Sequence, residues 1–305
     1  MGKNMKTSDT DELIRLFPYE EYAEDQAFSS LHLITLGLKN GSLDVEALSS
    51  QGAINATDTR GRTALWWASR RGDAEAVKVL LRNGASADIV DEQGVSALYA
   101  STFAKTPACL ELLLLHGAFF APNKLGWTPL HHAAAMCDDP RFVELLLRFD
   151  ATPDPTTLFG DSPFTMASQW GKLDNMKLLL AAGASIDGPD PTLYHMGPLQ
   201  SAIQAGEADT ALFLLENGAN YTLLTLEGRN ILHGVAIYGD VVLMEKLSKL
   251  SLMGVDATHK DNFGLTPVSY LLTRPDTNGL YTAFYKLFHS IKEAEIASVL
   301  SNPEG

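Results

Sequence analysis

The side chains best suited to catalysis in this chain are two histidines and a carboxylate in successive segments, His132, Asp161 and His195. A histidine beside a carboxylate commonly acts in general acid–base catalysis. Nothing in the spacing requires these three side chains to meet, and the short motifs of hydrolases, metalloproteases and phosphate-binding enzymes are absent from the sequence. No group of residues has metal-ligand spacing. We therefore predict no catalytic residue, no metal and no cofactor, and keep a catalytic pocket as the alternative.

An arginine cluster is the next group with recognisable chemistry. Arg60, Arg62, Arg70 and Arg71 stand close together in a chain whose formal net charge is -14. A guanidinium binds carboxylate or phosphate groups through planar, bidentate hydrogen bonds. The cluster is either a solvated edge or a clamp for an acidic partner. The acidic charge of the whole chain argues against nucleic acid and against anionic membranes as partners.

Aromatic residues form the third group. Interfaces are enriched in Trp, Tyr, Phe, Met and Arg, and such anchors supply much of the binding energy. The simpler alternative is that some of these side chains cover neighbouring turns. We predict a partner-binding surface that contains the four arginines together with Phe103, Trp127, Met136, Phe159, Asp161, Trp170, Tyr194, His195 and Tyr238.

An internal repeat indicates the elements that position these side chains. The phrase Gly-x-(Thr/Ser)-(Pro/Ala)-apolar, with variants, begins at Gly61, Gly94, Gly126, Gly160, Gly228 and Gly264, and His195 replaces the glycine in one copy. Successive copies are 32 to 36 residues apart. A second phrase, Leu-Leu-x-x-Gly-Ala, keeps the same period. Two phrases locked in phase predict one structural unit that is repeated along the chain.

Each unit is predicted to be a pair of helices. The hydroxyl of Thr63 or Ser96 is placed to cap the first helix, and Pro129 falls in a first turn, where its missing N–H is harmless. Gly84 is placed to end the second helix in the left-handed conformation. Asp150 stands where another unit needs that glycine. One pair cannot bury its apolar face, so neighbouring units must supply the core.

These phrases resemble the ankyrin repeat, and Trp127 to Ala134 is nearly an ideal copy. The resemblance covers roughly residues 55 to 275. The sequence of residues 62–68 is also similar to the ankyrin regions of fungal proteins. It implies an all-α solenoid of helix–turn–helix units with β-turn fingers, whose concave face binds partners. We divide the chain into a flexible segment (1–20), N-terminal capping helices (21–57), about seven repeats with the last incomplete (58–275), and a C-terminal capping helix and tail (276–305).

The function predicted from these observations is a non-enzymatic scaffold that binds a protein partner. The alternative is a small-molecule or catalytic pocket with aromatic walls in the middle repeats. Cys109 and Cys137 are isolated, and the N-terminal residues are polar and acidic. Isolated cysteines are typical of a reducing compartment, and a polar, acidic N-terminus does not have the pattern of a secretory signal. We therefore predict a location in the cytoplasm or the nucleus, and we also predict a monomer.

Overall fold

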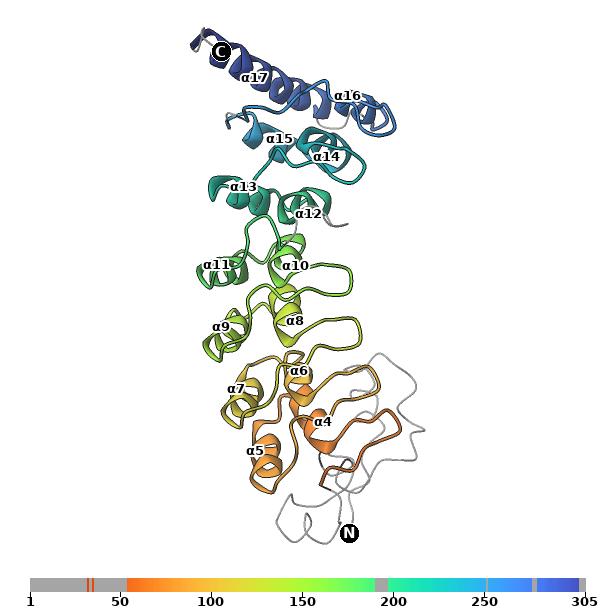
Figure 1. Ribbon diagram of the computed structural model, residues 1–305, viewed down its shortest axis with the longest axis vertical. Coiled ribbons are helices and arrows are strands. Elements are labelled where there is room, and N and C mark those ends of the chain that lie inside the picture. The colour runs from red at the N-terminus through yellow and green to blue at the C-terminus, as the bar shows by residue number, and fades with distance from the viewer. Residues whose placement is uncertain are drawn as a thin grey trace.

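The computed structural model describes His32, Thr35 and residues 54–189, 197–250, 252–275 and 279–301, with side chains as far as residue 293. Over these residues the chain forms helices α4 to α17 and two isolated β-bridges, with no extended strand. The helices stack in pairs along one long axis, with the connecting fingers on one side (Figure 1). The all-α solenoid predicted from the repeat is confirmed.

Each pair consists of an inner helix, which follows a finger, and an outer helix. The inner helices are α4 (Ala64–Arg71), α6 (Ala97–Ser101), α8 (Pro129–Met136), α10 (Pro163–Gln169), α12 (Pro198–Ala205), α14 (Ile231–Tyr238) and α16 (Pro267–Leu271). The outer helices are α5 (Ala74–Arg82), α7 (Ala108–Leu115), α9 (Arg141–Arg148), α11 (Leu173–Ala181), α13 (Ala208–Glu216), α15 (Val241–Leu247) and α17 (Leu280–Ser301).

The inner helices begin where the repeated hydroxyl residue predicts. The side chains of Thr63, Ser96 and Ser162 each accept a hydrogen bond from the backbone N–H three residues later. At Thr128 the cap is reciprocal, because the ring of His131 also accepts the N–H of Thr128. These bonds satisfy N–H groups that have no partner within a helix.

The outer helices mostly end at a glycine in the left-handed region, such as Gly84 with φ 86°. At the equivalent position Asp150 has φ 65°, and it is the one non-glycine residue with positive φ in the described part of the chain. The chain therefore keeps the same turn there at a steric cost that glycine would avoid.

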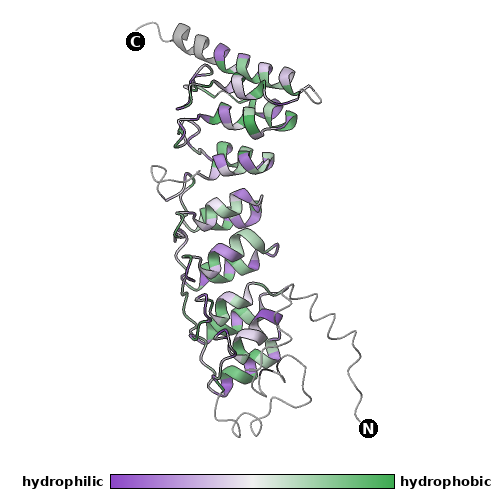
Figure 2. Ribbon diagram, turned by 90° about the vertical axis from the view of Figure 1, so that its right-hand side faces the viewer, coloured by the Kyte–Doolittle hydropathy of each residue, from purple (hydrophilic) through white to green (hydrophobic). Residues whose placement is uncertain are grey.

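The core is a set of residue columns that run through the stack. The outer helices contribute Leu80, Leu113, Leu146, Leu179, Leu214 and Leu247, all fully buried. The inner helices contribute Leu65, Leu98, Leu130, Phe164, Leu199 and Leu232 at the same depth. Each inner pair of the stack therefore buries its apolar side between its two neighbours, and the last pair, α16 and α17, packs on α14 and α15. Figure 2 shows both hydrophobic and hydrophilic residues on the pairs.

Candidate partner-binding face

In five of the described fingers, one side chain three residues before the turn glycine holds the finger in shape. Asp91 Oδ1 accepts the backbone N–H groups of Gln93 at 2.8 Å and Val95 at 2.9 Å. Asp58, Asn123, Thr157 and Asp261 make the same pair of bonds in their fingers. The recurrence of Asp, Asn and Thr at this position is visible in the sequence, but it is absent from the phrase that defined the repeat. The two hydrogen bonds that such a side chain accepts from the backbone stabilise the turn and make the finger rigid.

Backbone hydrogen bonds join neighbouring fingers. The N–H of Glu92 donates to Arg60 O, that of Lys124 to Gln93 O, and that of Leu158 to Leu125 O, each at 2.9 Å. Asn262 and Glu227 are joined in the same way at 2.8 Å. The tips of the fingers joined in this way therefore keep the same offset, so residues at their equivalent positions form rows.

The inner-helix row lies where the inner helices end. It comprises Phe103, Met136, Trp170 and Tyr238, which are 44%, 41%, 51% and 41% exposed. All four were predicted as surface residues. Met136, Trp170 and Tyr238 lie at equivalent positions, eight residues after the N-caps of α8, α10 and α14, whereas Phe103 lies seven residues after the N-cap of α6. Large apolar side chains that remain this exposed contribute little to the stack itself, so the row is available for a partner.

The finger-tip row is a second apolar line. It comprises Leu125, Leu158, Phe159, Leu226 and Phe263, which are all exposed. Phe159 belongs to the predicted site. The period of the repeat also places Leu125, Leu158 and Leu226 at exposed positions, and the structure adds Phe263. Trp127 is half-buried, with its ring 6.3 Å from that of His131.

A hollow of about 500 Å³ lies between the first two fingers and the ends of α4 and α6. Arg60 and Glu92 line it from the fingers, and Trp66, Arg70 and Phe103 line it from the inner helices. The guanidinium carbon of Arg70 lies 4.3 Å from the ring centre of Phe103 and 5.6 Å from that of Trp66. This stacking fixes a cation against an apolar floor.

The expectation that Arg62 lies on the surface is wrong. Its side chain is 3% exposed, and its Nε donates to Asp58 Oδ2 at 2.8 Å. Trp67 Nε1 donates to the same oxygen, and the guanidinium of Arg62 lies 4.4 Å from the Trp67 ring centre. Neighbouring tryptophans exclude water from this ion pair. Arg71 is exposed, and its Nη1 donates to Thr35 O at 2.8 Å.

The histidines of α8 are bound to the fold. Nδ1 of His131 accepts the N–H of Thr128, so its Nε2 donates to Asp161 O at 3.1 Å. Nδ1 of His132 lies 2.8 Å from Thr102 Oγ1, and its ring stacks 4.0 Å from that of Phe103. Burial lowers the pKa of each histidine to about 4, so both rings are neutral at physiological pH.

Of the predicted site, Tyr194 and His195 lie outside the described residues. Asp161 is partly exposed in its finger, where its backbone carbonyl binds His131. Trp170 lines a separate hollow of about 310 Å³ with Asp138 and Lys172. Of the described aromatic residues in the alternative pocket of the middle repeats, Trp170 lines this hollow, whereas Trp127 and Phe159 do not.

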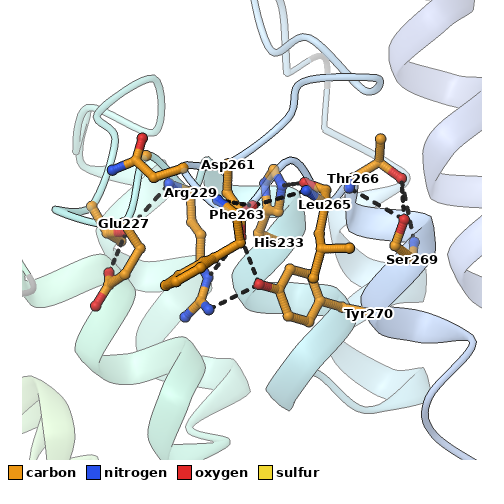
Figure 3. Close-up of polar contacts among 12 residues, drawn as sticks. Glu227, Arg229, His233, Asp261, Phe263, Leu265, Thr266, Ser269 and Tyr270 are labelled. Atoms are coloured by element: carbon orange, nitrogen blue, oxygen red, sulfur yellow. Dashed lines mark hydrogen bonds and ion pairs between the residues drawn. The ribbon is translucent and has the colours of Figure 1, made fainter.

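A partly buried polar network around the buried carboxylate of Asp261 joins the last two fingers (Figure 3). Tyr270 Oη donates to Asp261 Oδ2 at 2.6 Å, and Arg229 Nη2 donates to Tyr270 Oη at 3.0 Å. Burial by itself raises the pKa of Asp261, but the hydrogen bonds from Tyr270 and from the N–H groups of Leu265 and Phe263 outweigh it and bring the pKa to about 2. The network is thus a charged cross-link within the stack.

Neither a metal cluster nor a membrane span emerges from the described ranges. No three His, Cys, Asp or Glu residues there are grouped as metal ligands, and no helix there combines the length and apolar character needed to cross a bilayer.

The family model for ankyrin repeats (three copies) matches overlapping stretches that together cover residues 31–225, more than half of the chain. The chain belongs to the ankyrin repeat family. In the solved structure of the human ASB11 ankyrin repeat domain, the same fold covers 74% of this chain and 98% of that one, at 25% identity and a TM-score of 0.65.

Curated relatives match over shorter stretches. The tyrosine-protein kinase HTK16 of Hydra vulgaris is 36% identical over 121 residues, which cover 38% of this chain and 16% of the kinase. The nuclear factor NF-kappa-B p105 subunit of Gallus gallus is 30% identical over 174 residues, covering 55% of this chain and 17% of that protein. The matched regions thus span less than a fifth of either relative.

Proposed function

We propose that this chain is a non-enzymatic interaction scaffold that holds a segment of a partner protein between the finger-tip row and the inner-helix row. The observation that carries the proposal is the inner-helix row, four large apolar side chains that stay 41% to 51% exposed where the inner helices end, three of them at equivalent positions. Ankyrin repeat domains are generally protein-interaction modules, which supports the same assignment.

The geometry suits binding better than chemistry. The fingers are held by side-chain caps and joined by backbone bonds, so the face is ordered before a partner arrives. A preordered surface loses little conformational entropy on binding. His131 and His132 are neutral and committed to bonds within the stack, so they do not serve as accessible proton acceptors. We also propose a monomer in the cytoplasm or nucleus, with a protein and not nucleic acid or membrane as partner, consistent with the net charge of -14.

Trp170 is the most exposed member of the inner-helix row and provides the test. Truncation of an anchor residue costs about 2 kcal/mol of binding free energy, which is about thirtyfold in affinity. Phe119, which is 68% exposed in the segment after α7 and outside both rows, is the matched control.

The tagged chain and its Trp170→Ala and Phe119→Ala variants would be used to capture partners from cells of the source organism. We expect one protein to be retained by the parent chain and by Phe119→Ala, and to be lost from Trp170→Ala. Equal retention by the two variants would show that the inner-helix row is not the binding surface.

A further inference from the structure

We infer that a hollow between the third and fourth repeats is a second docking site, which takes an uncharged apolar residue of a partner protein together with an adjacent backbone carbonyl. The hollow has a volume of about 300 Å³ and is lined by the loops that lead from α7 to α8 and from α9 to α10, and by the start of α8. No residue of the inner-helix row or of the finger-tip row lines it. The site is therefore separate from the one proposed above and does not depend on it.

A hydrogen bond between neighbouring repeats recurs in the loops that follow the outer helices. The donor is the backbone N–H of the residue that follows the buried alanine at the end of the outer helix, and the acceptor is a side-chain oxygen in the preceding loop. The four bonds run from Ser86 to Asn55, from Phe119 to Asp88, from Ser185 to Asp154 and from Asn220 to Asp187, at 2.7 to 3.3 Å. Donor and acceptor are 31 residues apart in the first three of these bonds.

This bond is missing between the third and fourth repeats. Thr152 follows the buried Ala151, and the same spacing of 31 residues makes Ala121 its partner, which has no side-chain acceptor. Across the part of the chain that the structure describes, the N–H of Thr152 meets no other acceptor. The hollow lies at this gap, because Ala151 and Thr152 both line it. An occupant therefore finds a backbone donor that the fold itself leaves unused.

The walls of the hollow are mainly apolar. Phe120 and Pro122, the two neighbours of Ala121, line it on the side of the third repeat, and Pro155 lines it on the side of the fourth. Leu130 contributes from α8. An aliphatic side chain that enters this space leaves water for an apolar surface, which stabilises the bound state.

Charge decides which kind of acceptor fits the N–H of Thr152. None of the residues that line the hollow is charged, and Asp150 and Asp154 lie on either side of Thr152 in the sequence. Arg148, four residues before Thr152, pairs with Glu111 at 3.4 Å. A carboxylate would therefore lose its hydration here without gaining a cation. A backbone carbonyl accepts the same N–H without that cost, so the occupant is an apolar residue beside a carbonyl.

The experiment uses N-acetyl-leucine N-methylamide as the probe, because it holds one apolar side chain between two carbonyls. N-acetyl-glycine N-methylamide lacks the side chain, and isocaproate joins a similar apolar body to a carboxylate. Each compound is titrated into the isotope-labelled full chain, and the amide signal of Thr152 is followed in proton–nitrogen correlation spectra. We expect a saturable shift with the leucine probe, and binding at least about tenfold weaker for the other two compounds.

Two asparagine variants test the position of the site. Ala121→Asn supplies the missing acceptor in the way that Asn55 does for Ser86, so it occupies the N–H that the probe needs and should abolish the shift. Ala182→Asn makes the same replacement at the exposed C-cap of α11, where α5 and α13 have Asn83 and Asn217, and should leave the affinity unchanged.

Circular dichroism melts show whether each variant folds, and Pro155→Ala is the second variant if Ala121→Asn does not. Removal of this part of the wall should weaken the binding of the leucine probe severalfold. The absence of a saturable shift, equal affinity of the parent chain and Ala121→Asn for the leucine probe, or tighter binding of isocaproate would overturn the inference. The proposed function would stand in each case, because Trp170 lies outside this hollow.

Discussion

Stability should fall steeply in mild acid because two adjacent histidines are buried in their neutral form. In the fold the pKa of His131 and of His132 is about 4, lowered from 6.5 chiefly by burial. Because the pKa of each histidine is lower in the folded chain, the unfolded chain binds more protons than the folded chain between about pH 4 and pH 6.5. The stabilisation is therefore complete above about pH 6.5 and is lost as the pH falls toward 4.

The size of the effect follows from the two pKa values. Between pH 7 and pH 4.5, one histidine whose pKa moves from 6.5 to about 4 removes about 2 kcal/mol of stability. The pair removes roughly 4 kcal/mol, a large part of the stability of an ordinary domain. Burial raises the pKa of Asp91 and Asp154, which acts in the opposite direction, so the comparison of variants is more informative than the absolute slope.

The assay is urea unfolding followed by circular dichroism at pH 7, 5.5 and 4.5. Thr102 Oγ1 donates to Tyr99 O, so His132 Nδ1 donates to Thr102, and an asparagine amide can replace that donor. His132→Asn should be less stable at pH 7 but should lose about half as much stability on acidification. His116→Asn, at an exposed histidine, is the control. Acid sensitivity of His132→Asn equal to that of the parent chain would refute the linkage.

Three further predictions concern the fingers and turns. Gly126→Ala should destabilise the fold more than Gly264→Ala by about 1–3 kcal/mol. Both glycines have positive φ, but of the two only Gly126 would bring a Cβ against the backbone of the next finger, at 2.9 Å. Equal urea midpoints for the two variants would contradict this. Asp150→Gly should raise stability by about 0.5–1 kcal/mol, measured in the same titration, because φ is 65° there; a loss would mean that the aspartate has a further role. Tyr270→Phe should cost about 1–3 kcal/mol by removing the hydroxyl that donates to buried Asp261, and an unchanged thermal midpoint would show that the network adds nothing.

The sequence by itself determined the repeat, the helix pairs and the rows of exposed residues. The phrase around Thr63 predicts its own helix, because capping depends on residues that are three apart. The exposure of Phe103, Met136, Phe159, Trp170 and Tyr238 was predictable for a related reason: once the period is known, every residue has an equivalent in each repeat. The periodicity of the sequence therefore predicts most of this fold.

Tertiary structure decided which charged residues reach the surface. Arg62 and Arg70 look alike in the sequence, yet Arg62 is buried against Asp58 and Trp67, whereas Arg70 lies over Phe103 of the next repeat. Arg70 is placed by contact with a residue of the next repeat, whereas Arg62 is placed by an ion pair and a ring contact inside its own repeat. A repeating pattern specifies where each side chain begins, and tertiary packing decides where a long, flexible one ends.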